Sequence, residues 1–241
     1  MLLSIIIPTR NEEKIIGSIL KKLRDGITEH ECELIVLDGG STDRTVAIAK
    51  QYATVLEYRG AERKTIAWGK NEGARHAKGN MLLFIDADVE LPHANELLRT
   101  AFARFAADPK LVGLTANLRV LPELETFADR FFFGSVNFDH WWNNNVMHDG
   151  SASGEFQMIP KKAFDEVHGY KDYLAVAEDN DMFRRLARIG HTRIARDITV
   201  YHTGRRAHEV GWPRLLGEWF VNYMSVRFFD RSHHQEWYEV R

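Results

Sequence analysis

The sequence predicts an α/β domain whose mostly parallel central sheet is flanked by helices, and two observations lead to this fold class. Short apolar runs alternate with segments of helical spacing through the first half of the chain, as in sheets built from strand–helix–strand units. The 241 residues are 44% hydrophobic, which is enough for one sizeable core. Because no repeat, low-complexity tract or convincing linker divides the chain, we expect a single domain over residues 1–241.

The apolar runs that predict strands lie at residues 2–8, 34–37, 55–58, 81–85 and 111–114, with shorter signals at 156–159 and 192–200. Between the first two runs, Ile16, Ile19 and Leu23 recur at helical spacing and predict a helix over 15–23 that covers the sheet. Further helices are expected at 124–142, 161–167, 181–189 and 212–229. A polar loop rich in Asn and Ser is expected at 143–153.

Composition excludes several classes of protein. The formal net charge of −2 gives no reason to expect nucleic-acid binding, which usually accompanies a basic excess. The single cysteine, Cys32, rules out an intramolecular disulfide framework and a multi-cysteine zinc site. No run stays apolar for the roughly 20 residues that a membrane span needs. We therefore expect a cytoplasmic protein. Aromatic segments at 131–133, 141–142 and 219–229 leave open core packing, an acceptor surface or peripheral association with the inner face of the membrane.

Two carboxylates separated by one residue, Asp86 and Asp88, follow the apolar run at 81–85. In an open parallel sheet, ligands bind outside the carboxyl ends of the strands. Hard cations are held there by one or two carboxylates together with substrate phosphates. The pair therefore predicts a site for Mn²⁺ or Mg²⁺ that bridges a diphosphate. The alternative is that both Asp residues only open the turn before Leu91-Pro92.

A third carboxylate, Asp38, ends the second run and is followed by Gly39-Gly40. At the same sheet edge it can accept hydrogen bonds from a nucleobase or a ribose hydroxyl, or it can merely shape a strand-to-helix turn. The spacing of residues 9–12 is that of a capping box, and Ser41 to Asp43 precede the next helix, so both turns are expected to point backbone amides toward the ligand. Neither a Gly-x-Gly-x-x-Gly fingerprint nor a Walker loop is present.

Ordered motifs connect these signals. The first half contains Ser4-Ile5-Ile6-Ile7-Pro8-Thr9-Arg10-Asn11-Glu12-Glu13, Asp38-Gly39-Gly40-Ser41-Thr42-Asp43, Lys70-Asn71-Glu72-Gly73 with Ala77-Lys78-Gly79, and Asp86-Ala87-Asp88. The second half contains Gly154-Glu155-Phe156, His168-Gly169-Tyr170 and Ala177-Glu178-Asp179. This order, over residues 3–205, resembles the family 2 glycosyltransferases of GT-A fold. The resemblance implies a GT-A domain with a nucleotide-sugar donor half at 1–115, an acceptor and catalytic half at 116–206, and a C-terminal helical extension at 207–241.

The resemblance also implies roles for individual residues. It makes Asp179 the general base, assigns the metal to Asp88 and Asp86, and allows His202 as a third ligand. The implied donor-binding residues are Pro8, Thr9, Glu12, Asp38, Asn71 and Asp86, to which Arg63 is added as a phosphate contact by position alone. The implied acceptor or loop residues are Gly154, Glu155, Glu178, Arg205 and Arg206. For Arg63, Lys64, Lys70 and Arg75 a solvated helix face is expected ahead of a ligand contact, and Asp181 is expected to serve only the helix start.

The implied activity is metal-dependent, inverting transfer of a hexose-like sugar from a nucleoside diphosphate sugar, by preference a UDP-sugar. The hydroxyl acceptor would be a saccharide or a lipid carrier in cell-envelope polysaccharide or glycolipid synthesis. The chain lacks the Gln-x-x-Arg-Trp motif of processive synthases, which favours single transfers, and Gly39 replaces a second Asp that the family often has. The alternatives are a sugar-phosphate nucleotidyltransferase, whose Gly-rich loop is missing after the first strand, and a noncatalytic nucleotide-sugar-binding protein. The oligomeric state stays open.

Overall fold

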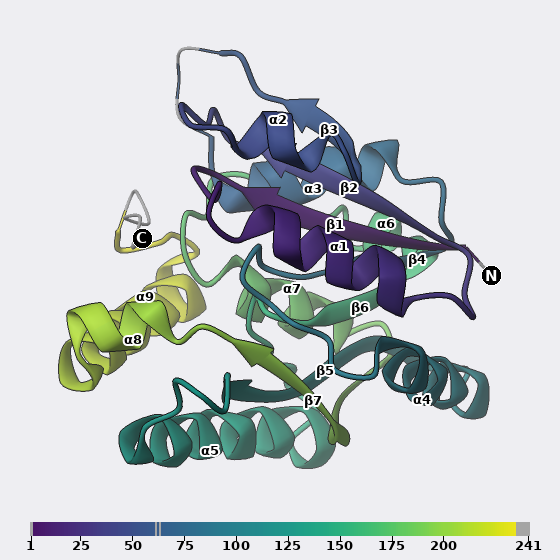
Figure 1. Ribbon diagram of the computed structural model, residues 1–241. Helices are drawn as coiled ribbons and strands as arrows, with labels where there is room; N and C mark the ends of the chain where they lie inside the picture. Colours follow the sequence, from purple (N-terminus) through teal and green to yellow (C-terminus); the bar gives the residue numbers. More distant parts are fainter. Residues whose placement is uncertain (1, 61, 63, 235–241) are drawn as a thin grey trace.

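A seven-stranded sheet forms the centre of the computed structural model, which describes residues 2–60, 62 and 64–234 (Figure 1). The strand order is β3-β2-β1-β4-β6-β5-β7, and β6 runs antiparallel to both of its neighbours while the other pairs are parallel. The strands are β1 (Leu3–Thr9), β2 (Cys32–Asp38), β3 (Thr54–Glu57), β4 (Met81–Phe84), β5 (Leu111–Val120), β6 (Gln157–Pro160) and β7 (His191–His202).

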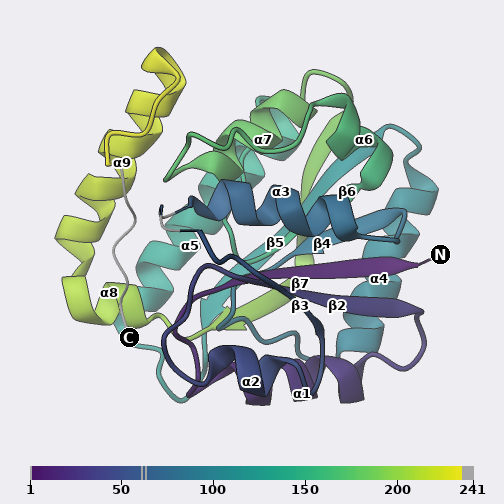
Figure 2. The same ribbon diagram turned by 90° about the horizontal axis from the view of Figure 1, so that it is seen from above.

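Helices cover both faces of this sheet (Figure 2). One apolar layer joins the sheet to α1 (Ile16–Gly26), α2 (Thr45–Ala49), α4 (Ala94–Ala107) and α5 (Phe127–Trp141). The other joins it to α3 (Ile66–His76), α6 (Lys161–Glu166) and α7 (Glu178–Leu186). Along β1 the side chains alternate as a two-sided strand requires: Ile5 and Ile7 enter the first layer, and Ile6 enters the second.

The predicted α/β class and mostly parallel sheet are confirmed, and the strand boundaries differ in an instructive way. The fifth strand was expected to stop at residue 114, but β5 continues to Val120. Polar residues such as Asn117 and Arg119 interrupt the apolar run there, while the backbone keeps pairing with β7 as far as Val120 and His202. Pairing with a neighbouring strand, which no local pattern reports, therefore extends β5 toward the functional edge.

The expected polar loop at 143–153 begins instead as a π-helix, η1 (Trp142–Val146), which continues directly from α5. Asn144 is fully buried in it, and its amide donates to the carbonyl oxygens of His140 at 2.8 Å and Ser151 at 2.5 Å. The Asn-rich composition therefore marks internal hydrogen bonding here rather than solvent exposure, which corrects the expectation of a loop.

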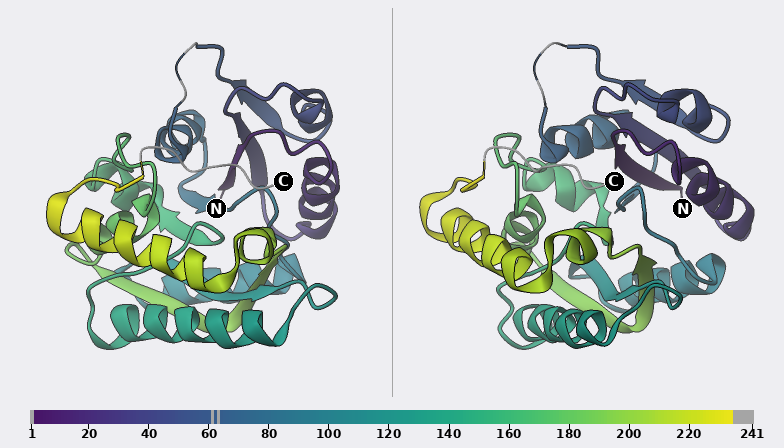
Figure 3. Two further views of the ribbon diagram at one scale, coloured as in Figure 1. Left: turned by 90° about the vertical axis from the view of Figure 1, so that its left-hand side faces the viewer. Right: turned by 60° about the vertical axis from the view of Figure 1, so that its left-hand side comes forward.

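After β7 come α8 (Arg205–Val210), which begins before the extension expected at 207–241, and α9 (Trp212–Phe229), which was predicted for 212–229. The part of the expected extension at 235–241 lies outside the described residues. Figure 3 shows α9 crossing the side of the molecule at which the strands of the donor half end. Near its start, the Trp212 indole donates to Asp129 at 2.9 Å; beyond its end, Ser232 Oγ accepts from the backbone of Ala175 and Val176 at 3.0 Å. Among the described residues, no helix is long and apolar enough to span a bilayer.

Candidate active site

Strand register brings the two halves of the chain together at one edge of the sheet. Thr9 at the end of β1 pairs with Asp38 at the end of β2, and β4 ends two residues before Asp86. Because β6 is antiparallel to β4, with Gln157 opposite Phe84, the residues that precede β6 lie at this same edge. Gly154 and Glu155 of the second half therefore face the Asp86 turn of the first.

A cavity of about 900 Å³ opens at this edge, within the volume range of small-molecule sites. Most of the sequence-predicted site residues line it: Pro8, Thr9, Glu12, Asp38, Asp86, Asp88, Gly154, Glu155, Glu178, Asp179, His202, Arg205 and Arg206. Arg63 lies outside the described residues. The cavity thus unites the predicted donor, metal and catalytic residues.

Asn71 does not line this cavity. It lies on α3, where its side chain donates to the Tyr170 carbonyl and accepts from the Tyr170 amide, both at 2.8 Å, and also donates to Asp172. These bonds use both ends of the amide to fix the segment before α7. The structure therefore gives Asn71 a structural role in place of the expected contact in the donor pocket.

Asp38 is buried, and its carboxylate accepts the backbone N–H groups of Gly40 and Ser41, each at 3.1 Å. Gly40 has φ +85°, a left-handed conformation that glycine adopts without steric cost. The alternative role, in which Asp38 shapes its own turn, is therefore realised. A carboxylate can accept about four hydrogen bonds. Asp38 can therefore still accept hydrogen bonds from a ligand in the cavity.

The turns after β1 and β2 bind each other rather than presenting free amides. The Asn11 N–H donates to Ser41 Oγ at 2.8 Å, and the Glu12 N–H donates to Thr45 Oγ1 at 2.7 Å. The first helix begins only at Ile16, so the expected capping box at residues 9–12 is wrong. Polar side chains of one turn satisfy the amides of the other, a pairing that the sequence spacing of either turn does not report.

Arg205, the first residue of α8, connects the second half of the chain to the donor edge. Its guanidinium binds both oxygens of Glu12, at 2.8 and 2.5 Å, and its Nε lies 3.6 Å from Asp88. Thr203 also donates to Asp88, at 2.5 Å. Arg205 and Arg206 begin α8 instead of lying in the expected loop. Glu12 is engaged by this bidentate pair, which is the stronger form of carboxylate recognition.

Asp86 lies where negative charge accumulates. Burial raises the pKa of Asp86 to about 7, and the charges of Glu155 and Asp88 add to the rise against the opposing charge of Lys70. The backbone approaches it closely, because a Cβ on Gly154 would come within 2.9 Å of Asp86 Oδ2. The negative charge of an ionised Asp86 is therefore not fully balanced by the protein. A divalent cation could bind the carboxylate oxygens of Asp86 and Asp88.

His202, the predicted third metal ligand, does not form a metal-binding group with Asp86 and Asp88. Among residues 2–60, 62 and 64–234, no three His, Cys, Asp or Glu side chains gather as a metal-binding group. His202 is buried, its Nδ1 accepts the Gly204 N–H at 3.2 Å, and its ring packs edge-on against Phe133. A cation at Asp86 and Asp88 would need the remaining ligands from phosphate or water, as is common for Mg²⁺.

Lys70 and Glu178 form a buried ion pair with an Nζ–Oε1 distance of 2.9 Å. Lys70 is completely inaccessible, which corrects the expectation of a solvated helix face. Burial is the largest single effect and opposes the charge of Lys70, but Glu178, Tyr170, Asp86 and Asp179 together outweigh it and raise the pKa of Lys70. Glu178 is thus neutralised by α3 rather than presented to an acceptor.

Asp179 is the second residue of α7, and the residue that precedes this helix, Ala177, has φ +62°. Its Oδ1 accepts the Asn180 N–H at 2.7 Å. Burial and the Glu178 charge raise the pKa of Asp179 well above its ordinary value, against the opposing effects of Lys70 and the Asn180 N–H. A left-handed alanine is strained, and such strain is concentrated at functional sites. Asp179 is therefore a half-buried carboxylate prepared to take up a proton.

Further cavity residues come from α5, η1 and α9. His140 and Val136 of α5, with Asn143 of η1, form one part of the lining; Trp219 and Tyr223 of α9 form another. The α5 and η1 residues were not named as site residues from the sequence, whereas Trp219 and Tyr223 fall in the aromatic segment 219–229, for which an acceptor surface was left open. Their helices were predictable from 3.6-residue spacing, but aromatic residues at such spacing usually form core. Only the docking of α9 across the edge makes them cavity residues.

The sequence resembles known glycosyltransferases over most of its length. Residues 4–167 match the family model described as glycosyl transferase family 2. The succinoglycan biosynthesis protein ExoA of Rhizobium meliloti is 26% identical over 217 residues, which are 86% of this chain and 65% of that protein. The 4,4'-diaponeurosporenoate glycosyltransferase of Staphylococcus haemolyticus is 38% identical over 109 residues, which are 42% of this chain and 28% of the relative. The chain therefore spans less than two thirds of either relative.

Solved structures share the fold. The mannosyltransferase PcManGT of Pyrobaculum calidifontis, in complex with GDP-Man and Mn²⁺, superposes with a TM-score of 0.71 at 19% identity, covering 93% of this chain and 64% of that one. TarS of S. aureus in complex with UDP-GlcNAc gives a TM-score of 0.65 at 19% identity, over 83% of this chain and 58% of that one. These structures establish the GT-A fold. On the family match over most of its length, the chain belongs to glycosyl transferase family 2.

Proposed function

We propose that this protein is a metal-dependent inverting glycosyltransferase that moves a sugar from a nucleoside diphosphate sugar, by preference a UDP-sugar, to a hydroxyl acceptor. One observation carries the proposal: the Asp86–Asp88 pair and Asp179 line the same cavity at the carboxyl edge of the sheet. Similar folds bind GDP-Man or UDP-GlcNAc, which supports a nucleotide-sugar donor.

Asp86 and Asp88 are the residues that would hold Mn²⁺ or Mg²⁺. Such a cation, when bound, supplies positive charge that stabilises the departing diphosphate. The Mn²⁺ in a complex of a similar fold supports this choice of ion. Arg205, at 3.6 Å from Asp88, brings a fixed cation to the same corner and would keep a diphosphate oriented there.

Asp179 is proposed as the general base. Its carboxylate takes the proton of the acceptor hydroxyl while that oxygen attacks the anomeric carbon from the side opposite the diphosphate. The C–O bond to the acceptor forms as the bond to the diphosphate breaks, so a single displacement inverts the anomeric centre. The raised pKa of Asp179 suits this role, because a base works best with a pKa near the operating pH.

Pro8, Thr9 and Asp38, at the ends of β1 and β2, are proposed to contact the nucleoside. They lie at the strand ends where nucleotides bind in open α/β sheets, and all three line the cavity. Asp38 has the free acceptor capacity that a ribose hydroxyl or a nucleobase N–H requires.

The acceptor is proposed to carry a lipid and to be reached at a membrane surface. Trp142 and Phe220 line the cavity and are also exposed, so the apolar wall continues out to the surface. Along α9 the exposed residues Phe220, Met224 and Phe228 repeat every four positions. Exposed apolar surface that begins at the mouth of a site fits an acceptor whose tail remains in the bilayer.

The activity test is release of nucleoside diphosphate from UDP-glucose, UDP-N-acetylglucosamine and GDP-mannose, with and without Mn²⁺. We expect Mn²⁺-dependent release that is lost in Asp88→Asn. The matched control is Glu90→Gln, since Glu90 follows Asp88 but pairs with Lys22 at 2.5 Å outside the cavity. An Asp88→Asn variant as active as Glu90→Gln would refute the assignment of the metal.

The membrane proposal is tested by sedimentation with vesicles of phosphatidylethanolamine and phosphatidylglycerol. A buried Phe contributes about 1.5–3 kcal/mol, so Phe220→Ser with Phe228→Ser should weaken binding more than tenfold. Ile189→Ser, an exposed apolar residue at a position after α7, is the control. Failure of the wild-type protein to bind, or equal binding by the double variant, would contradict the proposal.

A further inference from the structure

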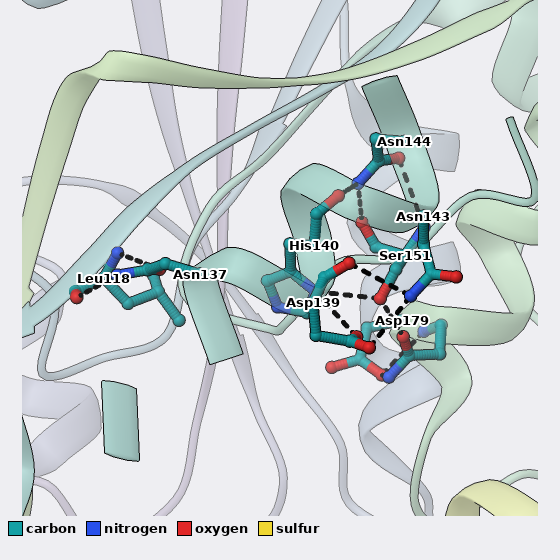
Figure 4. A network of polar contacts seen from close by, with 9 residues as sticks. Leu118, Asn137, Asp139, His140, Asn143, Asn144, Ser151 and Asp179 are labelled. Atoms are coloured by element: carbon teal, nitrogen blue, oxygen red, sulfur yellow. Dashed lines mark hydrogen bonds and ion pairs between the residues drawn. The ribbon is translucent and has the colours of Figure 1, made fainter. Parts of the chain in front are cut away.

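The proposed base is held by a hydrogen-bonded network that reaches across to α5 (Figure 4). The Asn180 N–H donates to Asp179 Oδ1 at 2.7 Å, and Asn180 Nδ2 lies 3.4 Å from the same oxygen. Ser151 Oγ donates to Asn180 Oδ1 at 2.9 Å, and His140 Nδ1 lies 2.8 Å from Ser151 Oγ. A continuous chain thus connects His140 to Asp179.

The direction of the protons in this chain follows from the donors available. Ser151 has one O–H, which it gives to an oxygen of Asn180 that can only accept; the carboxylate of Asp139, which also faces Ser151, is likewise only an acceptor. The bond between His140 and Ser151 therefore requires Nδ1 of His140 to carry the proton. Burial lowers the pKa of His140 to about 4, so the ring is neutral near pH 7 and donates from this one nitrogen.

This order of donors also fixes the Asn180 amide. With its oxygen directed at Ser151, its nitrogen is directed at Asp179. Ser151 itself is clamped by Asn144 of η1, whose Oδ1 accepts the Ser151 N–H at 3.2 Å and whose Nδ2 donates to the Ser151 carbonyl at 2.5 Å. Through these two bonds, the π-helix η1 holds Ser151 between His140 of α5 and Asn180 of α7. π-Helices are often found at functional sites.

We propose that Ser151, oriented by His140, is a positioning residue for the general base: it fixes Asn180 so that the Asp179 carboxylate stays ionised and directed into the cavity. The inference rests on the proposed function, because it concerns the base of that reaction. Glu178, Lys70, Glu155 and Tyr170 also interact with Asp179, from its own helix, from α3, from the segment before β6 and from the segment before α7. None of these four is a partner in the Ser151 chain, so their effects should persist when Ser151 is changed. Asp139 of α5 faces Ser151 and lies 4.0 Å from His140 Nδ1, so its carboxylate is a charged group beside the chain itself.

The test compares Ser151→Ala with Asn180→Ala. Hydrogen bonds donated to a carboxylate favour its charged form, so losing Asn180 Nδ2 raises the pKa of the base. We expect the acidic limb of the kcat–pH profile to move up by about half to one unit, with kcat at pH 7 about 3–10-fold lower and the donor KM unchanged. The double variant should show no further shift, because both changes remove the same contact.

The matched control is Asn137→Ala. Asn137 lies on α5 like His140, but it exchanges two 2.9 Å hydrogen bonds with the Leu118 backbone and takes no part in the chain to Asp179. It should lower stability without moving the pH profile. Because Ser151 is buried and Asn180 only half-buried, Asn180→Ala decides the question should Ser151→Ala fail to fold.

The result also separates this inference from the proposed function. Asp179→Asn at the wild-type rate would overturn the base assignment itself. An inactive Asp179→Asn combined with wild-type pH profiles for Ser151→Ala and Asn180→Ala would overturn only the positioning role. Without turnover, the same shift is read from the ¹³C titration of the Asp179 carboxyl group, assigned by its absence in Asp179→Asn; an unmoved midpoint in both variants contradicts the proposal.

Discussion

The donor edge of the cavity and its catalytic side satisfy their polar groups in different ways. At the donor edge, the turns after β1 and β2 hydrogen-bond each other, and Glu12 is matched by Arg205. On the catalytic side, burial and the Glu178 charge raise the pKa of Asp179. The pKa of Asp86, the proposed metal ligand, is raised in the same way. The turns proposed to contact the nucleoside are therefore complete before a ligand arrives, whereas the proposed metal ligand and the proposed base retain charge that the protein does not compensate.

The largest effect is expected from neutralising the proposed base. Asp179→Asn should lower kcat by about 10²–10⁴-fold, because proton transfer to a positioned base contributes that much. Stability should hold or rise, since the raised pKa shows that burial disfavours the charged carboxylate. Steady-state kinetics and thermal unfolding of the same preparation measure both effects.

Asp181→Asn is the matched control for Asp179→Asn. Asp181 lies on the same turn of α7 but is buried against Arg185 at 2.7 Å and Lys171 at 3.2 Å, outside the cavity. Its loss should lower stability and leave kcat near the wild-type value. The reverse pattern, with stability lost in Asp179→Asn and kcat lost in Asp181→Asn, would exchange the two roles.

The next effect concerns the buried cation beneath the catalytic side. Lys70→Met should cost about 3–5 kcal/mol of unfolding free energy, because it leaves the Glu178 charge buried without a partner. Lys22→Met, which breaks an exposed pair with Glu90, should cost less than about 1 kcal/mol. Denaturant unfolding measures both.

Adding Glu178→Met to Lys70→Met should recover part of the lost stability, since two apolar side chains replace one isolated charge. Equal stability of Lys70→Met and Lys22→Met would mean that the Lys70–Glu178 pair does not stabilise the site.

A smaller effect comes from His140 and depends on pH. Burial sets the pKa of His140 at about 4, below its ordinary 6.5, so the unfolded chain binds the proton more readily than the folded protein. Stability should therefore fall as pH drops from about 6.5 to about 4, by roughly 1.4 kcal/mol per pH unit and about 3 kcal/mol in total. In His140→Gln this contribution to the slope should vanish, and parallel slopes for the two proteins would show that His140 is not buried in the neutral form.

The smallest effect tests how closely the backbone approaches Asp86. A Cβ in Gly154→Ala would meet Asp86 Oδ2 at 2.9 Å, so the carboxylate must move, and Mn²⁺ affinity should fall by about tenfold. Gly217→Ala on α9, where no described atom lies within 4 Å of the added Cβ, should leave Mn²⁺ binding unchanged. Titration calorimetry measures the Mn²⁺ affinity of both variants. Equal affinities would show that Gly154 does not affect the proposed metal site.

Much of the fold was predictable because local patterns of apolar residues indicate its strands and helices. Alternating apolar runs gave β1, β2 and β4, and 3.6-residue spacing gave α1 and α9. The carboxylates at the strand ends were also predictable as neighbours, since parallel strands end at one edge. Asp38, Asp86 and Asp88 indeed line one cavity.

The rest depended on contacts between distant parts of the chain. Lys70 was expected in solvent and is buried because Glu178, 108 positions away, neutralises it. Glu12 was expected to be available for the donor, but Arg205, 193 positions away, binds it. The role of Ser151 required the π-helix that carries Asn144. Pairings of this kind are set by tertiary packing, and no spacing along the sequence encodes them.

The anomeric configuration of the transferred sugar tests the proposed reaction most directly. It is read from the ¹H NMR coupling constant of the anomeric proton in the product, formed with the donor that the nucleotide-sugar panel identifies. A single displacement assisted by Asp179 predicts the configuration opposite to that of the donor. A product that retains the donor configuration would contradict it, because retention requires a covalent sugar intermediate or attack from the side of the departing diphosphate.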